Sequence, residues 1–215
     1  MKTTSKVAII GMGNIGQVVA ANLAKAGRPF IAADRNVDKA KELAGKWGAS
    51  AQARDIHYAV KEAGIVVLAI PFGAIADFIN QYAADLEGKI IVDPSNPIAP
   101  DEKGGFKKII AENQSAGAIN AAALPKNTWL AKALGTLGAG SLANAAFQTP
   151  ERAILFYATD DTSINADVEQ LIIDNGFEPV RIGGLDKSIR IEVFGDLHEF
   201  GALGKTVTLK EVKNI

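Results

Sequence analysis

The sequence contains no cysteine among its 215 residues. Disulfide bonds and thiolate chemistry are therefore excluded, and the composition is compatible with a reducing cytoplasm, where we expect the protein to be found. Histidine occurs only twice, and no cluster of residues has the spacing of metal ligands. We therefore predict that the protein binds no metal.

Long runs of charge of one sign are also missing. The 23 basic and 24 acidic residues are spread along the chain and give a net charge of −1. This balance argues against nucleic acid and anionic membranes as partners. The charge-free run at 7–24 is interrupted by three glycines, and the run at 133–150 is rich in Gly, Ala and Asn. Neither is typical of a membrane span or a targeting signal, so we expect neither.

The strongest positive signal is a short apolar strand at 6–10, followed directly by a G-x-G-x-x-G turn. In such a turn the first glycine permits a tight bend, the second lets the backbone approach a pyrophosphate, and the third lets the next helix pack on the strand. That helix, which Gly27 closes, would point its free amides at the phosphates. We assign the six turn residues to cofactor binding: Gly11, Met12, Gly13, Asn14, Ile15 and Gly16.

A second apolar segment, at 29–33, ends in an acid, Asp34, which lies 18 residues after Gly16. This is close to the spacing of the carboxylate that binds the ribose hydroxyls in dinucleotide-binding folds. The order strand, turn, helix, strand and acid therefore predicts that the protein binds NAD or NADP.

Strand and helix patterns alternate along the rest of the chain. They predict a doubly wound, Rossmann-like α/β fold, with a mostly parallel sheet, helices on both faces and a C-terminal helical segment. Further strands are expected at 65–70, 89–92, 129–134, 153–158 and 179–182. Further helices are expected at 38–47 (with Asp38 as its cap), 55–63, 75–86, 106–116 or beyond, 163–175 and 186–205. No linker separates folded parts, so we predict one domain over 1–215, with a cofactor half at 1–97 and an acceptor half at 98–215.

Ligands of open α/β sheets lie beyond the carboxyl ends of the strands. The segments at those ends supply the remaining candidates. For cofactor binding they are Arg35, Ala69, Ile70, Pro71, Phe72 and Asn96, and for the substrate they are Pro97, Thr136, Leu137, Gly138 and Ala139.

Five segments carry a family resemblance: the glycine turn, 68–72, 95–97, 136–139 and 195–205. Together they resemble the NADPH-dependent reductases of coenzyme F420, a 5-deazaflavin, over almost the whole chain. Related members include the cytosolic oxidoreductase domain of membrane ferric reductases.

This resemblance implies hydride transfer between the nicotinamide C4 and a deazaflavin- or flavin-like ring stacked against it, in a homodimer. It also implies that the C-terminal segment walls the pocket of the second ring, which adds Phe194 and Leu197 to the substrate residues. Both reactants are cofactors, so the protein mainly supplies binding, orientation and exclusion of water. We therefore name no catalytic acid or base.

The neighbours Asp34 and Arg35 act in opposite directions on the choice of dinucleotide. A carboxylate at that position favours the free 2′-hydroxyl of NAD, whereas Arg35 is suited to the 2′-phosphate of NADP. The reductases that the chain resembles usually carry a small hydroxyl residue in place of Asp34. We favour NADP(H), because Arg35, Asn36 and Lys39 can compensate, and keep NAD(H) as the alternative.

The two histidines are interpreted as structural. His57 begins a helix among polar residues and is expected at the surface. His198 lies in the segment that would wall the second pocket, and we expect it on a helix face, hydrogen-bonded to a neighbour or at a subunit contact, rather than acting as a proton donor.

Two other functions stay open. One is a non-catalytic sensor of the NADPH/NADP ratio, which would need no apolar space beside the nicotinamide. The segments 136–139 and 194–204 are expected to form such a space, which favours the enzyme over the sensor. A 3-hydroxyacid or imine dehydrogenase would need a base in a long helical C-terminal domain, for which we expect this chain to be too short.

Overall fold

The computed structural model describes residues 5–212 and is built around a six-stranded parallel sheet. Its strand order is β3-β2-β1-β4-β5-β8. The strands are β1 (Val7–Ile10), β2 (Phe30–Ala33), β3 (Ala51–Ala53), β4 (Ile65–Leu68), β5 (Ile90–Asp93) and β8 (Trp129–Lys132). The order reverses between β1 and β4, which is where open α/β sheets bind their ligands. The predicted doubly wound, Rossmann-like α/β fold is confirmed.

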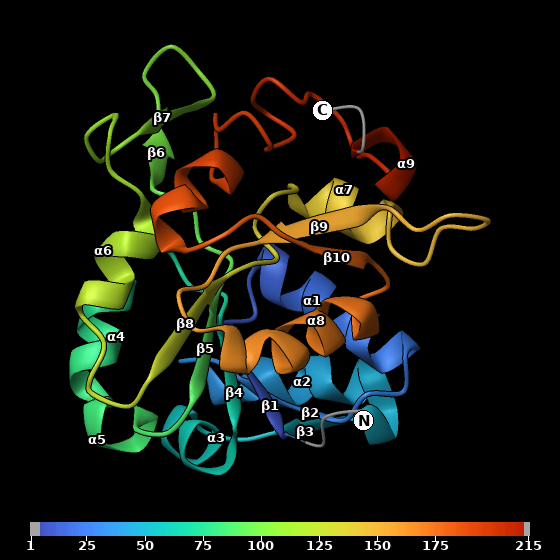
Figure 1. Cartoon of the computed structure of the whole chain (residues 1–215). Helices are drawn as coiled ribbons and strands as arrows, with labels where there is room; N and C mark the ends of the chain where they lie inside the picture. The colour runs from blue at the N-terminus through green and yellow to red at the C-terminus, as the bar shows by residue number, and fades with distance from the viewer. Residues whose placement is uncertain (1–4, 213–215) are drawn as a thin grey trace.

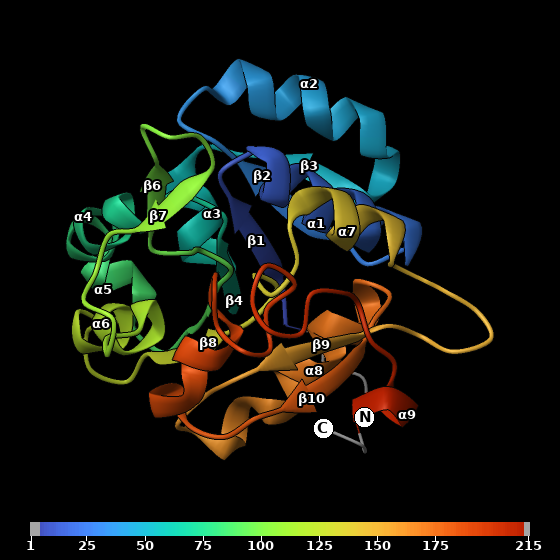
Figure 2. The same ribbon diagram turned by 90° about the horizontal axis from the view of Figure 1, so that it is seen from above.

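Helices cover both faces of this sheet. The α-helices of residues 5–212 are α1 (Asn14–Lys25), α2 (Val37–Trp47), α3 (Ile56–Glu62), α4 (Ile75–Gln81), α5 (Ala83–Leu86), α6 (Ala116–Ala122), α7 (Ala139–Asn144), α8 (Asn165–Asp174) and α9 (Leu209–Val212). Figures 1 and 2 show α1, α2 and α7 on one side of the central strands and α3, α4 and α5 on the other. None of the helices between residues 5 and 212 has the length and apolar character that a membrane crossing requires.

The central strand β1 is fully buried because its side chains alternate between two apolar layers. Val7 and Ile9 belong to the layer under α1, α2 and α8, whereas Ala8 and Ile10 belong to the layer under α3 and α4. A strand buried on both faces is a continuous apolar run, which is why the sequence locates β1 and β4 so clearly.

The strands predicted at 153–158 and 179–182 form a separate pair. They are β9 (Ile154–Tyr157) and β10 (Glu178–Arg181), which run parallel to each other. Backbone hydrogen bonds of 2.9 and 3.0 Å between Lys132 and Ala158 join this pair to the end of β8. The division of the chain into a cofactor half and an acceptor half stays a prediction.

The helix predicted at 106–116 is wrong. This region begins with a hairpin of β6 (Ile98–Pro100) and β7 (Phe106–Lys108), and α6 starts only at Ala116, where Ser115 caps it. Gly104 and Gly105 both have positive φ, of 89° and 80°, and so turn the chain back into β7. Two smaller differences are that Asn36 rather than Asp38 caps α2, and that the helix predicted at 75–86 is divided into α4 and α5.

The C-terminal helical segment predicted at 186–205 is largely wrong as well. Only a 3-10 helix, Leu185–Ile191, is present, and the chain from 192 to 205 is irregular. A Cβ atom on Gly201 would overlap the carbonyl oxygen of Gly195, so the two backbones are packed against each other. This close approach, together with the positive φ of 72° at Phe194, is incompatible with a continuous helix.

Candidate functional site

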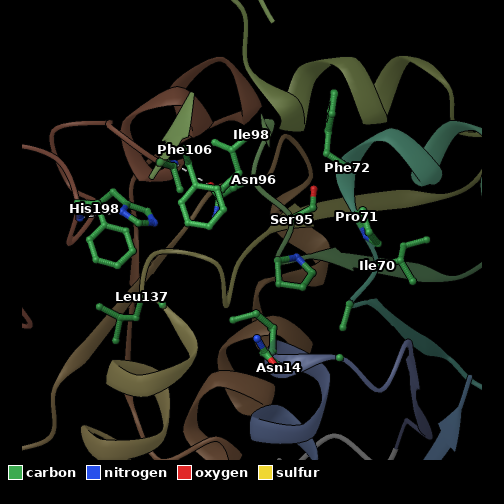
Figure 3. A pocket seen from close by; sticks show the side chains of 17 residues that line it. Asn14, Ile70, Pro71, Phe72, Ser95, Asn96, Ile98, Phe106, Leu137 and His198 are labelled. Atoms are coloured by element: carbon green, nitrogen blue, oxygen red, sulfur yellow. Dashed lines mark hydrogen bonds between the residues drawn. The ribbon is translucent and has the colours of Figure 1, made fainter. Parts of the chain in front are cut away.

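A pocket of about 390 Å³ lies at the carboxyl ends of the central strands. It extends from the glycine turn between β1 and α1 to the β6-β7 hairpin and the C-terminal segment. Figure 3 shows Ile70, Pro71 and Phe72 on one side of it and Phe106 and His198 on the other. Its lining residues are Gly13, Asn14, Ile15, Ala69, Ile70, Pro71, Phe72, Pro94, Ser95, Asn96, Ile98, Phe106, Leu137, Gly138, Val193, His198 and Phe200.

The glycine turn has the geometry expected for a phosphate-binding loop. Gly11 has a φ of 96°, and a Cβ atom there would lie 2.8 Å from the Ile70 side chain. A Cβ atom on Gly16 would overlap the carbonyl oxygen of Gly11. In contrast, a Cβ atom on Gly13 would meet nothing within 4 Å. Gly11 and Gly16 are therefore needed for packing, while Gly13 leaves open space at the N-terminus of α1, where backbone amides are available to an anion.

Asp34 ties the end of β2 to the glycine turn. Its carboxylate accepts hydrogen bonds from the backbone amides of Met12, at 2.8 Å, and Asn36, at 3.0 Å, and lies 3.9 Å from the Lys39 ammonium. Burial raises the pKa of Asp34, but these hydrogen bonds and the nearby cations outweigh it, so the net shift is downward. Asp34 is thus a charged, structural acceptor, and its charge is partly balanced by Lys39.

The structure brings together only part of the predicted site. Of the residues assigned from sequence, Gly13, Asn14, Ile15, Ala69, Ile70, Pro71, Phe72, Asn96, Leu137 and Gly138 line the pocket. The others do not line it: Gly11, Met12, Gly16, Asp34, Arg35, Pro97, Thr136, Ala139, Phe194 and Leu197. Arg35 is exposed beyond the end of β2, and Leu197 is buried in a separate apolar cluster with Ile154 and Phe156. The functional roles of all these residues stay predictions.

A buried ion pair lies behind the pocket wall. The Lys132 ammonium is 3.1 Å from the Asp93 carboxylate, and both side chains are at most 3% exposed. Asp93 also accepts hydrogen bonds from the Ser95 amide, at 2.7 Å, and the Asn120 side chain, at 2.8 Å, while Lys132 donates to the Ser95 carbonyl. This network fixes the backbone after β5, from which Ser95 and Asn96 face the pocket.

Asn96 and His198 connect three loops around the pocket. The Asn96 side chain donates to the Gly135 carbonyl, at 3.0 Å, and accepts from the Val193 amide, at 2.7 Å. His198 accepts from the Phe200 amide through Nδ1, at 3.0 Å, so Nε2 carries the proton and donates to the same Gly135 carbonyl, at 3.1 Å. The expected hydrogen bond of His198 to a neighbour is confirmed, although the residue lies on an irregular segment rather than a helix.

The stability of the protein should fall as the pH falls below about 6.5, the ordinary pKa of histidine, in part because of His198. Burial lowers the pKa of His198, and the hydrogen bond to Gly135 offsets this only partly. Below the ordinary pKa the unfolded chain takes up a proton that the folded protein excludes, so the free energy of unfolding decreases by at most about 1.4 kcal/mol per pH unit until the folded pKa is reached. Urea unfolding between pH 8 and pH 5 should show a shallower decrease for His198→Gln than for the unchanged protein. Equal slopes would contradict this account.

Sequence reasoning misses several pocket residues. Ile98 and Phe106 lie on the hairpin, part of which overlaps the wrongly predicted helix, and Val193 and Phe200 lie on the irregular C-terminal segment. Phe200 falls within the segment 194–204 that is expected beside the pocket, but the sequence does not single it out. The glycine pair before Phe106 is a usable turn signal, whereas nothing local marks Val193 or Phe200 as pocket residues. Within residues 5–212, no group of three or more His, Asp or Glu side chains is placed to hold a metal ion.

Comparison with known proteins relates the part of this site that precedes residue 98 to a family. Residues 6–97 match the profile of the family described as NADP oxidoreductase, coenzyme F420-dependent. The match covers the cofactor side of the chain, which contains the domain of this family. The resemblance that the glycine turn and the 68–72 and 95–97 segments suggested is thus confirmed. No curated protein matches the chain with significant similarity.

Solved structures extend the likeness beyond the matched residues. A hypothetical protein from Sinorhizobium meliloti is 30% identical, with a TM-score of 0.81, over 95% of this chain and 96% of its own. A protein from Arthrobacter sp., provisionally named an F420-dependent NADP reductase, is 20% identical, with a TM-score of 0.73, over 86% of this chain and 87% of its own. A 3-hydroxyisobutyrate dehydrogenase from Mycobacterium tuberculosis is 18% identical, with a TM-score of 0.59, over 87% of this chain but 57% of its own. The last two show the shared fold.

Proposed function

We propose that the protein is an oxidoreductase that transfers a hydride between NADP(H) and a planar deazaflavin- or flavin-like ring, and that it works as a homodimer. In the reducing direction, one NADPH, one oxidised ring and one proton give NADP⁺ and the reduced ring. The chemistry resides in the two cofactors, and the protein brings them together in the correct orientation and keeps water out.

The observation that carries this proposal is the continuity of the pocket. It starts at Gly13 and the first turn of α1, where the pyrophosphate would be held, and continues between the 69–72 segment and the β6-β7 hairpin. A dinucleotide bound at the turn would therefore extend its nicotinamide into an apolar space that has room for a second ring. A protein that only sensed the NADPH/NADP ratio would need no such space.

A direct test is to mix the purified protein with NADPH and each candidate acceptor in turn, and to follow the absorbance of NADPH together with that of the ring. We expect NADPH oxidation that is matched by reduction of at least one deazaflavin or flavin. Tight binding of NADPH without reduction of any acceptor would favour the sensor and contradict the enzyme. Sedimentation at several protein concentrations tests the homodimer.

Arg35→Ala should weaken the binding of NADP more than that of NAD. The exposed Arg35 side chain follows β2, where the 2′-phosphate would lie, and a charge-assisted hydrogen bond to it contributes about 1.5–3 kcal/mol. Calorimetric dissociation constants for both dinucleotides should show at least a tenfold loss for NADP and a much smaller loss for NAD. Arg152→Ala is the matched control, since Arg152 is also exposed but follows the 133–150 run, away from β2. Equal losses for NAD and NADP would mean that Arg35 contacts only the part that the two share.

A further inference from the structure

We propose that the hydroxyl of Ser95 binds the carboxamide group of the nicotinamide and so positions the ring for hydride transfer. This inference rests on the proposed function, because it concerns the dinucleotide that the glycine turn would hold. It adds one side chain to the cofactor-binding residues that the sequence predicts.

Ser95 follows strand β5 and lies in the wall of the pocket. The residue is 8% exposed, and Figure 3 shows it among the lining residues, between Asn96 and Pro71. Its hydroxyl oxygen is buried and has no hydrogen-bond partner within residues 5–212. A buried hydroxyl without a partner is unfavourable, and rotation about χ1 redirects it without moving the backbone. A polar group of a ligand in the pocket can therefore supply the missing partner.

The position of Ser95 along the sheet fits the nicotinamide end of the dinucleotide. Strand β4 separates β1 from β5, so β5 lies two strand spacings, about 10 Å, from the strand that carries the glycine turn. Asp34, where the adenine ribose is expected, follows β2 on the opposite side of β1. A pyrophosphate at the turn therefore directs the other ribose across β4 and the nicotinamide toward Ser95.

The other polar side chains that line the pocket have different partners or lie elsewhere in it. The Asn96 side chain donates to one backbone carbonyl and accepts from one backbone amide, and both ring nitrogens of His198 are hydrogen-bonded. Asn14 begins α1 and so lies at the pyrophosphate end. Among the lining residues, all of which fall within 5–212, Ser95 is therefore the best-placed polar side chain for the nicotinamide.

The backbone that carries Ser95 is held in place before a ligand arrives. Its amide donates to Asp93, at 2.7 Å, its carbonyl accepts from Lys132, and Pro94 before it has a φ locked by its ring. A fixed hydroxyl suits the carboxamide, which offers both an acceptor oxygen and a donor nitrogen beside the reacting C4. Holding this group would limit rotation of the ring and so keep C4 in one orientation toward the acceptor.

NADP and 2′-phospho-ADP-ribose test this contact, because the second compound lacks the nicotinamide and keeps the rest of the molecule. Calorimetry should show that Ser95→Ala weakens the binding of NADP and NAD about three- to tenfold, and leaves the binding of 2′-phospho-ADP-ribose unchanged. Unchanged affinity for NADP would overturn the inference. Equal losses for NADP and 2′-phospho-ADP-ribose would also overturn it, because Ser95 would then contact the ribose or the phosphates.

Ser188→Ala is the matched control. Ser188 is fully buried, donates to the Glu192 carboxylate at 3.0 Å and does not line the pocket. This variant should lower the thermal stability of the ligand-free protein and leave the affinity for NADP unchanged. Ser95→Ala should do the opposite, since its hydroxyl has no protein partner to lose within residues 5–212. A lower stability of Ser95→Ala with equal losses for both ligands would mean that Ser95 is structural.

Hydride transfer separates the carboxamide contact from the proposed enzyme activity. If Ser95→Ala selectively weakens NADP binding but no deazaflavin or flavin is reduced by the unchanged protein, the contact is supported and the proposed function is contradicted. If Ser95→Ala reduces an acceptor with the kcat of the unchanged protein and the same KM for NADPH, the proposed function stands and the contact is overturned.

Discussion

Lys132→Met should lower the free energy of unfolding by about 3–5 kcal/mol, because it leaves the Asp93 carboxylate buried without its cation. Both side chains are almost fully buried, so water cannot replace the lost ammonium. The Ser95 amide and the Asn120 side chain would still donate to Asp93, but neutral donors do not balance a buried charge. Urea unfolding at pH 7.5 is the measurement.

A second substitution distinguishes loss of the ion pair from loss of packing. Adding Asp93→Asn to Lys132→Met removes the unpaired charge, so the double variant should be more stable than Lys132→Met alone. Lys46→Met is the surface control, since the Lys46 side chain is 61% exposed and its pair with Glu42 should contribute little. If the double variant were as unstable as the single one, packing around the Lys132 stem rather than charge would be responsible.

The cofactor side of the molecule is predictable from sequence because its signals are local. The run before Gly11 is apolar on both faces of one strand. The glycine positions follow from close contacts within a few residues or with the segment directly after β4. The spacing along the chain is enough to find Asp34. Its bond to the Met12 amide cannot be found in this way, because it depends on where the turn meets β2 in three dimensions.

The acceptor side is less predictable because long-range contacts decide it. The apolar residues of 193–203 fit a helix by spacing, but the close packing of Gly195 against Gly201 overrides that preference. As a result Leu197 turns into the core and Phe200 reaches the pocket, whereas a helix would place these two residues, three positions apart, on the same face. Ala139 is predicted beside the second ring only because it follows a predicted strand. In the structure it begins α7 and does not line the pocket.

Gly13→Val should weaken dinucleotide binding by about 2 kcal/mol or more, roughly thirtyfold, while the fold survives. The backbone of Gly13 has a φ of −80°, which any residue adopts, and a Cβ atom there meets no protein atom within 4 Å. The branched side chain would instead occupy the open space over the N-terminus of α1, where the pyrophosphate should lie. Calorimetry with NAD and NADP measures the loss, and thermal unfolding without ligand checks the fold.

The same substitution at Gly45 is a matched control, because Gly45 lies on the exposed side of α2 and a Cβ atom there would also meet nothing within 4 Å. Gly45→Val should leave both dissociation constants unchanged. Gly11→Val, in contrast, should unfold the turn, since Gly11 combines a positive φ with close contacts to Ala69 and Ile70. Only Gly13 therefore separates binding from folding within the turn, and unchanged affinity in Gly13→Val would mean that the turn is structural and that the dinucleotide binds elsewhere.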